Sequence, residues 1–395
     1  SIIFLCLVSC KTVDVLNSSF KGISRDNALL IARNFINQSL YDNSKVDGNI
    51  VLSIDSVICS SDDSFIPLMY IISGRPAGFV IVSASQAQDP ILAYSYENKM
   101  DLTKMNPTFW QWINGCKLMI ERSISDTNSP VTENITNEWN NLLHEGQIPE
   151  DSKMVITREL GPLLHTTWNQ LDGYNDSIVP DKNVPDGYYF STGCSISRNG
   201  NPPAGCVATA IAQVMKYWEF PGFYKWGIMP DKIDRTTSVE SVSEIARFLK
   251  NIGRHTEMNY SCDGSGATPL NALSALKNYG YNKNMQLLTY NDVTLKENVI
   301  KDLEMLKPVI FTGVDYQIKV GHMWVCDGFS KHVYPTTRGV KEDDSEIYLR
   351  MNWGWGGHYD GWFLYNNFRP SYYFQDNSVI CDIFPLNNDN VVVSK

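Results

Sequence analysis

The sequence has little positive charge and no long apolar segment. Its 33 Lys and Arg residues are outnumbered by 43 Asp and Glu residues, so the formal net charge is -10 and the pI is about 5.1. This balance argues against a nucleic-acid role through a basic surface. No apolar run has the length of a transmembrane helix. The composition is that of an exported soluble enzyme.

Metal-binding motifs are also missing from the sequence. There is no Cys-x-x-Cys pair, and no His/Cys cluster has zinc spacing, so we expect neither a metal nor a cofactor. There are nine cysteines, which is many for an exported chain. Without Cys6, Cys10 and Cys206, an even number remains, which favours disulfides whose pairing is not readable from sequence. These six residues are Cys59, Cys116, Cys194, Cys262, Cys326 and Cys381.

Cys206 follows a turn of small residues and precedes a helical pattern. The apolar spacing from Val207 to Trp218 predicts an amphipathic helix, and Pro221-Gly222 would end it. The amides at a helix N-terminus lower the pKa of a thiol, so a nucleophilic cysteine is expected at such a position. The alternative is a buried structural cysteine, since free cysteines are among the most buried residues.

His322 is the best candidate for the base that a cysteine nucleophile needs. The protein has only six histidines, and His322 lies near the start of an apolar run bounded by glycines, which predicts a buried strand. His332 lies in a stretch that reads as a loop rich in Lys, Thr and Arg. A histidine in a strand can also be a core residue, so position alone does not decide its role.

A third candidate element is the strand that ends at Asn352 and continues into a loop rich in Gly and Trp. Asn352 could accept a hydrogen bond from one imidazole nitrogen and leave the other facing sulfur. Trp353 and Trp355 would shield that pair from water, although such residues also fill tight corners. The order Cys, His, Asn is the one expected of papain-like peptidases.

Together, Ala204-Gly205-Cys206-Val207-Ala208-Thr209-Ala210, Gln213-Val214-Met215-Lys216-Tyr217, Gly321-His322 and Asn352-Trp353-Gly354-Trp355-Gly356-Gly357 resemble the streptopain family of bacterial cysteine endopeptidases. The resemblance implies that Cys206 is the nucleophile and His322 its base. A family glutamine that donates to the oxyanion is best matched by Gln170, acting with the Cys206 amide. Support for the histidine comes from the Asn-Trp-Gly-Trp region, and we expect Asn352 to orient it.

The resemblance extends to the first half of the chain, where residues 78–84 and 90–95 are similar to the family's inhibitory prosegment. The pattern itself predicts a helix at about 27–37, a hairpin formed by 67–72 and 79–84, and a second helix at 109–124. A polar stretch broken by Gly and Pro near 145–160 reads as a cleavable linker.

The first ten residues resemble a truncated lipoprotein signal peptide. Leu7-Val8-Ser9-Cys10 matches a bacterial lipobox, so Cys10 would be diacylglycerated and would anchor the protein to a membrane. The alternative is a buried strand. We expect an exported protein, held at the outer surface or in the periplasm and released after maturation.

We therefore expect a lipoprotein signal at 1–10, an inhibitory α+β prodomain at 11–152 and a papain-like peptidase domain at 153–395. The resemblance implies an α+β fold in which a helical half carries Cys206 and an antiparallel sheet half carries His322. The zymogen would be activated by proteolysis and would then hydrolyse protein or peptide substrates, while its own prodomain acts as an intramolecular inhibitor. It would do so by covering the cleft or displacing His322, and residues 94–105 would match its inhibitory loop.

Three alternatives remain at this stage. Cys194 is a rival nucleophile, although no helical pattern follows it and a disulfide or packing role suits it better. The chain could be a catalytically silent binding lipoprotein with a papain-like domain. It could also be a transglutaminase-like acyl transferase, although the third residue of such enzymes is usually Asp, whereas Asn352 stands here.

Overall fold

The computed structural model describes residues 22–41, 50–60, 65–98, 100, 107–125, 131–144, 153–179, 192–289, 291–315, 320–334, 345–365 and 376–386. Two compact units divide the chain. Unit 1 contains residues 1–159, 329–349 and 359–373, and unit 2 contains residues 160–328, 350–358 and 374–395. Strands β8 (Val320–Val333) and β9 (Glu346–Asn352) contribute residues to both units.

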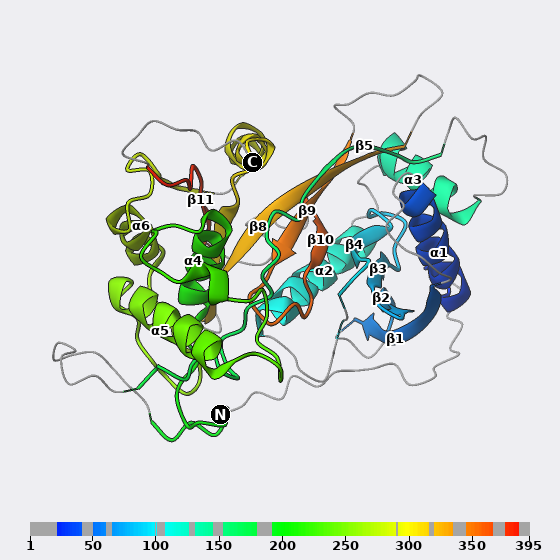
Figure 1. Cartoon of the computed structure of the whole chain (residues 1–395). Coiled ribbons are helices and arrows are strands. Elements are labelled where there is room, and N and C mark those ends of the chain that lie inside the picture. Colours follow the sequence, from blue (N-terminus) through cyan, green and yellow to red (C-terminus); the bar gives the residue numbers. More distant parts are fainter. Residues whose placement is uncertain are drawn as a thin grey trace. The chain divides into compact units, whose positions relative to one another are not determined.

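Unit 1 is built on an antiparallel sheet with the strand order β1-β2-β3-β4-β10 (Figure 1). The bounds of its helices and strands are α1 Arg25–Tyr41, β1 Val51–Cys59, β2 Pro67–Arg75, β3 Phe79–Ser83, β4 Ile91–Ser95, α2 Pro107–Ser125, α3 Glu133–Leu143 and β10 Gly361–Leu364. Strand β5, Val155–Leu160, pairs with β8. The helices predicted near 27–37 and 109–124 and the hairpin of β2 and β3 are confirmed.

The core of unit 1 forms between the sheet and its helices. All five residues of β3 are buried, as are all five of β4, because both faces of these strands are covered. Phe35 of α1 packs in a cluster with Val80 and Val82 of β3. Phe109 of α2 stacks on Tyr359, and its ring centroid lies 4.5 Å from that of the tyrosine.

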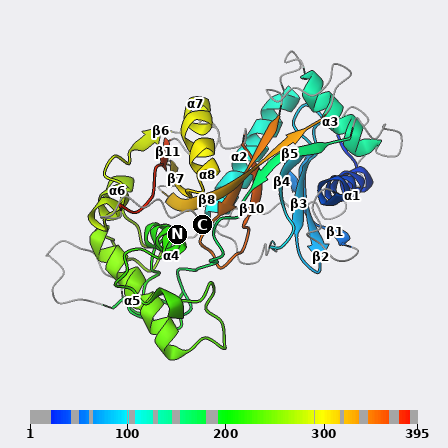
Figure 2. The ribbon, with the colours of Figure 1, turned by 45° about the horizontal axis from the view of Figure 1, so that its top comes forward.

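Unit 2 combines three main helices with the part of the same sheet that runs in the antiparallel order β8-β7-β11-β6 (Figure 2). Its main elements are α4 Cys206–Trp218, α5 Val239–His255, α6 Pro269–Asn278, β6 Leu287–Thr289, β7 Val309–Asp315 and β11 Asp376–Ile380. A 3-10 turn spans Trp226–Ile228, and a short helical stretch comprises α7 Asp292–Thr294, a π-helical segment Leu295–Ile300 and α8 Lys301–Glu304.

Helix α4 lies in the centre of unit 2. Every residue from Val207 to Met215 is buried, and the helix packs against both α5 and α6. The same hydrophobic cluster includes Phe248 of α5 and Val325 of β8, so the helical part and the strands share one core. This packing fixes the first turn of α4 beside β8.

A disulfide joins Cys194 to Cys262 across 68 residues of unit 2. The expectation that Cys194 has a disulfide role is confirmed, and the bond removes it as a rival nucleophile. Among the described residues, Cys116, Cys206, Cys326 and Cys381 are not in a disulfide, and all of these except Cys206 are buried. Cys206 is thus the one free thiol in the described part of the chain that is partly exposed.

Several expectations fall on residues that the structure does not describe. These are the segment 1–10 with Cys10, residues 145–152 of the linker, and most of the 99–105 stretch of the expected inhibitory loop. In the described part of the chain, no helix has both the length and the apolar character needed to cross a membrane.

Candidate active site

Cys206 is the first residue of α4, as the sequence predicts. The residue before it, Gly205, has a φ of 91°, and a Cβ built there would lie 2.9 Å from the Met258 sulfur. Glycine is required because this conformation and this close contact both exclude a side chain. The tight turn brings the thiol to the start of the helix.

The pKa of Cys206 differs from the expectation. Burial raises the pKa of the thiol above its usual value, although the main-chain amides of Met323, Val207 and Cys206 itself lower it. The helix N-terminus thus acts in the predicted direction, but loss of water around the sulfur outweighs it. In this structure the group is a neutral thiol at physiological pH.

His322 lies in β8, where it is opposite Gly313 of β7. Its Nε2 is 3.0 Å from the carbonyl oxygen of Trp353. A carbonyl can only accept, so the proton must be on Nε2, and Nδ1 keeps its lone pair. The site therefore contains the imidazole tautomer that a base needs.

Three tryptophans surround the His322 ring. Its centroid lies 5.8 Å from Trp324, 6.2 Å from Trp353 and 6.1 Å from Trp355, with all three rings nearly parallel to it. Burial among these indoles lowers the pKa of His322 to about 4, while the bond to Trp353 opposes the shift. The imidazole is neutral at physiological pH.

Cys206 and His322 line one cavity of about 550 Å³. Its other walls come from residues 257–271, next to α6, and from β7 and β8. No hydrogen bond joins the thiol to the imidazole, although both side chains are described. The structure therefore brings the two residues to one cleft as a neutral, unbonded pair.

Asn352 does not bond to His322, which differs from the sequence expectation. Its Nδ2 donates to the carbonyl of Thr166 at 2.8 Å, and its Oδ1 accepts from the amide of Gly354 at 3.1 Å. The Asn352 side chain thus shapes the turn that follows β9. The turn places the main-chain carbonyl oxygen of Trp353 against the imidazole, where the side-chain oxygen of Asn352 was expected.

Gln170 lies next to the turn that precedes Cys206. Its carbonyl accepts from the amide of Ala204 at 2.9 Å, two residues before Cys206. The side chain is only 4% exposed, and its Nε2 is buried without a hydrogen-bond acceptor. A buried donor without a partner is rare and costly, as expected of a group kept for a ligand.

Gln213 connects three parts of the site, and sequence reasoning gave it no role. It lies on α4 two turns after Cys206 and is fully buried. Its Oε1 accepts from the amide of Trp168 at 3.1 Å, and its Nε2 donates to Asn352 Oδ1 at 3.0 Å. The available signal was a glutamine in an otherwise apolar helix.

Comparison with known proteins agrees with this geometry. The family model of the Peptidase C10 family matches residues 168–223 and 222–363, and that of the Spi protease inhibitor matches residues 21–120. The matched family defines the class of protein, which is a cysteine peptidase. The chain belongs to the Peptidase C10 family, whose relatives include streptopain, and an inhibitory prodomain precedes the peptidase.

Two curated relatives show how far the similarity extends. Streptopain of Streptococcus pyogenes is 25% identical over 77% of this chain and 75% of its own length. The thiol protease/hemagglutinin PrtT of Porphyromonas gingivalis is 23% identical over 80% of this chain, which spans only 37% of that protein.

A solved structure shares the fold. Prointerpain A of Prevotella intermedia superimposes with a TM-score of 0.60 and 21% identity, covering 86% of this chain and all of that one. The expected fold class, a papain-like α+β domain preceded by a prodomain, is confirmed.

Proposed function

We propose that Cys206 is the nucleophile and His322 the general base of a cysteine endopeptidase that acts on proteins and peptides. The observation that carries this proposal is the bond from His322 Nε2–H to the Trp353 carbonyl, beside a cleft that also contains Cys206. That bond leaves Nδ1 as the acceptor for the thiol proton. If His322 were only a structural residue of the core, nothing would require it to line the same cleft as a partly exposed cysteine.

The reaction is an acyl transfer. The Cys206 thiolate attacks the peptide carbonyl, and the proton taken up by His322 passes to the leaving amine. Gln170 Nε2 and the Cys206 amide donate to the oxyanion, since the glutamine donor is buried and has no other partner. Water then hydrolyses the thioester, with His322 as base. Trp353 orients the imidazole, and with Trp355 it keeps water from its flat faces.

The full chain is latent because its thiol and imidazole are both neutral. A thiol with a raised pKa next to an imidazole with a lowered pKa does not form the ion pair that gives cysteine peptidases their reactivity. Removal of the prodomain would let the two groups approach and exchange a proton. We place the cut between Lys153 and Glu159, because the first of the three stretches that make up unit 1 ends at residue 159.

Export and a lipid anchor at Cys10 are part of the same proposal. The lipobox resemblance of Leu7-Val8-Ser9-Cys10 supports them. Globomycin, which blocks lipoprotein signal peptidase, should cause an unprocessed precursor to accumulate. Radiolabelled palmitate should enter the wild-type chain and not a Cys10→Ser variant, whereas equal labelling of both would exclude the anchor.

N-terminal sequencing and casein hydrolysis test the peptidase itself. The processed fragment should begin between Lys153 and Glu159, cleave casein, and lose that activity in Cys206→Ala and His322→Ala variants. A fragment that begins after Gln170 would contradict the proposal, because the oxyanion donor would be lost. Incorporation of amines into casein without hydrolysis would instead indicate a transglutaminase-like acyl transferase.

A further inference from the structure

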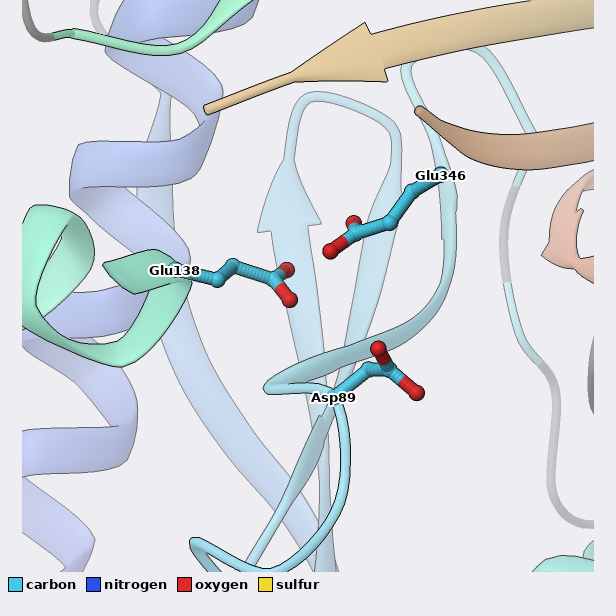
Figure 3. A group of neighbouring side chains, drawn as sticks. All are labelled: Asp89, Glu138 and Glu346. Carbon is cyan, nitrogen blue, oxygen red and sulfur yellow. The ribbon is translucent and has the colours of Figure 1, made fainter. Parts of the chain in front are cut away.

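Three carboxyl groups converge within unit 1, far from one another in the sequence. Asp89 lies in the turn before β4, Glu138 on α3 and Glu346 at the start of β9 (Figure 3). One oxygen from each residue can be chosen so that all three lie within 4.8 Å of one another. None of these residues belongs to the peptidase site.

Within the described part of the chain, the negative charge of this cluster has no counter-charge. None of the described lysines or arginines forms an ion pair with the three carboxyl groups. Glu138 is 0% exposed. Its Oε1 accepts from the Tyr334 hydroxyl at 3.3 Å, whereas Oε2 is buried and has no N–H or hydroxyl donor. The carboxyl groups of Glu138 and Glu346 can share a hydrogen bond only while one of them is protonated. An uncompensated buried carboxylate is costly, so something else must neutralise it.

Two agents could neutralise the cluster: protons or a cation. Burial, followed for Glu138 by repulsion from Glu346 and Asp89, raises the pKa of Glu138 well above its usual value. Burial likewise raises the pKa of Asp89 to about 6 and that of Glu346 to about 8. Asp89 and Glu346 would therefore lose their protons as the pH rises towards 8, although a bound cation would favour their release at lower pH.

The donor atoms suit a hard cation. All are carboxylate oxygens, and the hydroxyls of Tyr334 and Tyr348 donate hydrogen bonds to Glu138 and Glu346. Oxygens that lie within 4.8 Å of one another can surround either calcium or magnesium. Magnesium demands near-ideal octahedral geometry and dehydrates reluctantly, whereas calcium accepts irregular sets of carboxylates and water at about 2.3–2.6 Å. A cluster of three carboxylates from three separate elements therefore suits calcium better.

The cluster is also accessible. Asp89 and Glu346 are partly exposed, whereas Glu138 is completely buried. Water molecules could complete the coordination on the exposed side, as in many calcium sites with few protein ligands.

We propose that Asp89, Glu138 and Glu346 form a calcium-binding site in unit 1, where Asp89 and Glu138 come from the expected prodomain and Glu346 from the segment matched by the peptidase family. The ion would crosslink α3, the turn between β3 and β4, and the start of β9. Calcium would thereby stabilise unit 1 without taking part in the peptidase chemistry.

Thermal unfolding of the full chain with and without calcium tests this proposal. The Cys206→Ala chain prevents self-cleavage; it is stripped with EGTA, exchanged into metal-free buffer at neutral pH and titrated with CaCl2 or MgCl2. A site of this kind should raise the Tm of the first unfolding transition by about 5 °C at a hundredfold excess of calcium over its Kd. Magnesium should have a smaller effect, and isothermal titration calorimetry should show one calcium per chain.

Isosteric variants separate the two accounts. Glu138→Gln and Glu346→Gln, each checked for folding by circular dichroism, should lose the calcium shift, whereas Glu133→Gln, an exposed change on the same helix, should keep it. The proposal is overturned if CaCl2 does not change the Tm of the parent chain and Glu138→Gln raises it, because protons then neutralise the cluster. An equal calcium shift in the parent and both glutamine variants would overturn it as well.

Discussion

The Nε2 of His322 donates to the carbonyl oxygen of Trp353 over 3.0 Å. A main-chain atom thus sets the tautomer of the imidazole, whereas a side-chain amide does so in the arrangement expected from the Cys, His, Asn order. The consequence for mutagenesis is direct. Replacement of Asn352 should act through the shape of the turn, because Asn352 itself bonds to Thr166, Gly354 and Gln213.

The first prediction concerns the reactivity of Cys206 in the full chain as a function of pH. Burial raises the pKa of the thiol and lowers that of His322 to about 4, so no thiolate forms through proton transfer between pH 4 and 8. Alkylation of Cys206 by iodoacetamide should be slow across this range and should accelerate only above the usual thiol pKa of about 8.5. Peptide mapping after a timed exposure gives the rate at Cys206 separately from the other cysteines. A fast plateau near pH 6 would show that the ion pair already exists in the full chain.

The second prediction concerns Gln170 as oxyanion donor. Gln170→Glu keeps the size of the side chain but replaces the unpartnered amide donor by a charged acceptor. In the processed enzyme, kcat on a peptide substrate should fall by about 10²–10³-fold with little change in KM, since the donor acts mainly in the transition state.

Asn169→Asp is the matched control for Gln170→Glu. It places the same charge one residue away and preserves the Oδ1 that accepts from the Gln170 amide at 2.7 Å. Its kcat should stay much closer to that of the parent enzyme. Equal losses in the two variants would mean that local charge, not the lost donor, explains the effect.

The third prediction concerns Gln213 as a positioning residue. Gln213→Met removes both its bonds, leaving the Trp168 amide and Asn352 Oδ1 without this partner. The loss should cost about 1–3 kcal/mol in the free energy of unfolding. Because the Trp168 segment and the turn after Asn352 would move relative to α4, kcat should fall by about 10²-fold.

A glutamate at the same position distinguishes positioning from simple packing. Gln213→Glu still accepts from the Trp168 amide, but donates to Asn352 only when it is protonated. Its activity relative to the parent enzyme should therefore rise as the pH falls. A ratio that does not change with pH would contradict the assigned hydrogen bonds.

The fourth prediction concerns Gly205. Gly205→Ala must adopt a φ of 91° and place its Cβ 2.9 Å from Met258, so it should lose about 1–3 kcal/mol of stability and displace Cys206. Gly222→Ala is the control, because nothing lies within 4 Å of a Cβ at that position. Denaturant unfolding monitors the first effect and alkylation of Cys206 in the processed form monitors the second. Equal stability of the two variants would refute the steric argument.

Sequence reasoning succeeds where local pattern and chemistry coincide. The helix at Cys206 was predictable because a small-residue turn precedes apolar residues at helical spacing, and the strand at His322 because an apolar run lies between glycines. The resemblance to the streptopain family rests on the same segments. The structure agrees with both elements and with their common cleft.

The contacts that sequence could not supply are those made by main-chain atoms or by distant residues. The carbonyl of Trp353 carries no sequence signal, and Gln213 looks like an ordinary member of α4. His332 was expected in a loop, yet it is fully buried in β8 and bonds to Ser330 at 2.9 Å. The residues around His332 in the sequence are polar, so the alternation of side chains that is typical of a strand could not be recognised there.

The expectation of no metal rests on Cys and His spacing, which indicates zinc sites, and it stays a prediction. Such spacing cannot test the calcium site proposed above, because only the tertiary fold brings the carboxyl groups of residues 89, 138 and 346 together.

The most direct test of the central claim is labelling of Cys206 before and after proteolytic processing. The full chain and its processed fragment are treated briefly with E-64 near pH 6, and the labelled peptide is identified by mass spectrometry. Labelling should appear at Cys206 in the processed fragment alone, together with casein hydrolysis, and should disappear in the Cys206→Ala and His322→Ala variants. Rapid labelling of Cys206 in the unprocessed chain, or labelling of another cysteine in the active fragment, would contradict the account of a nucleophile restrained in the zymogen.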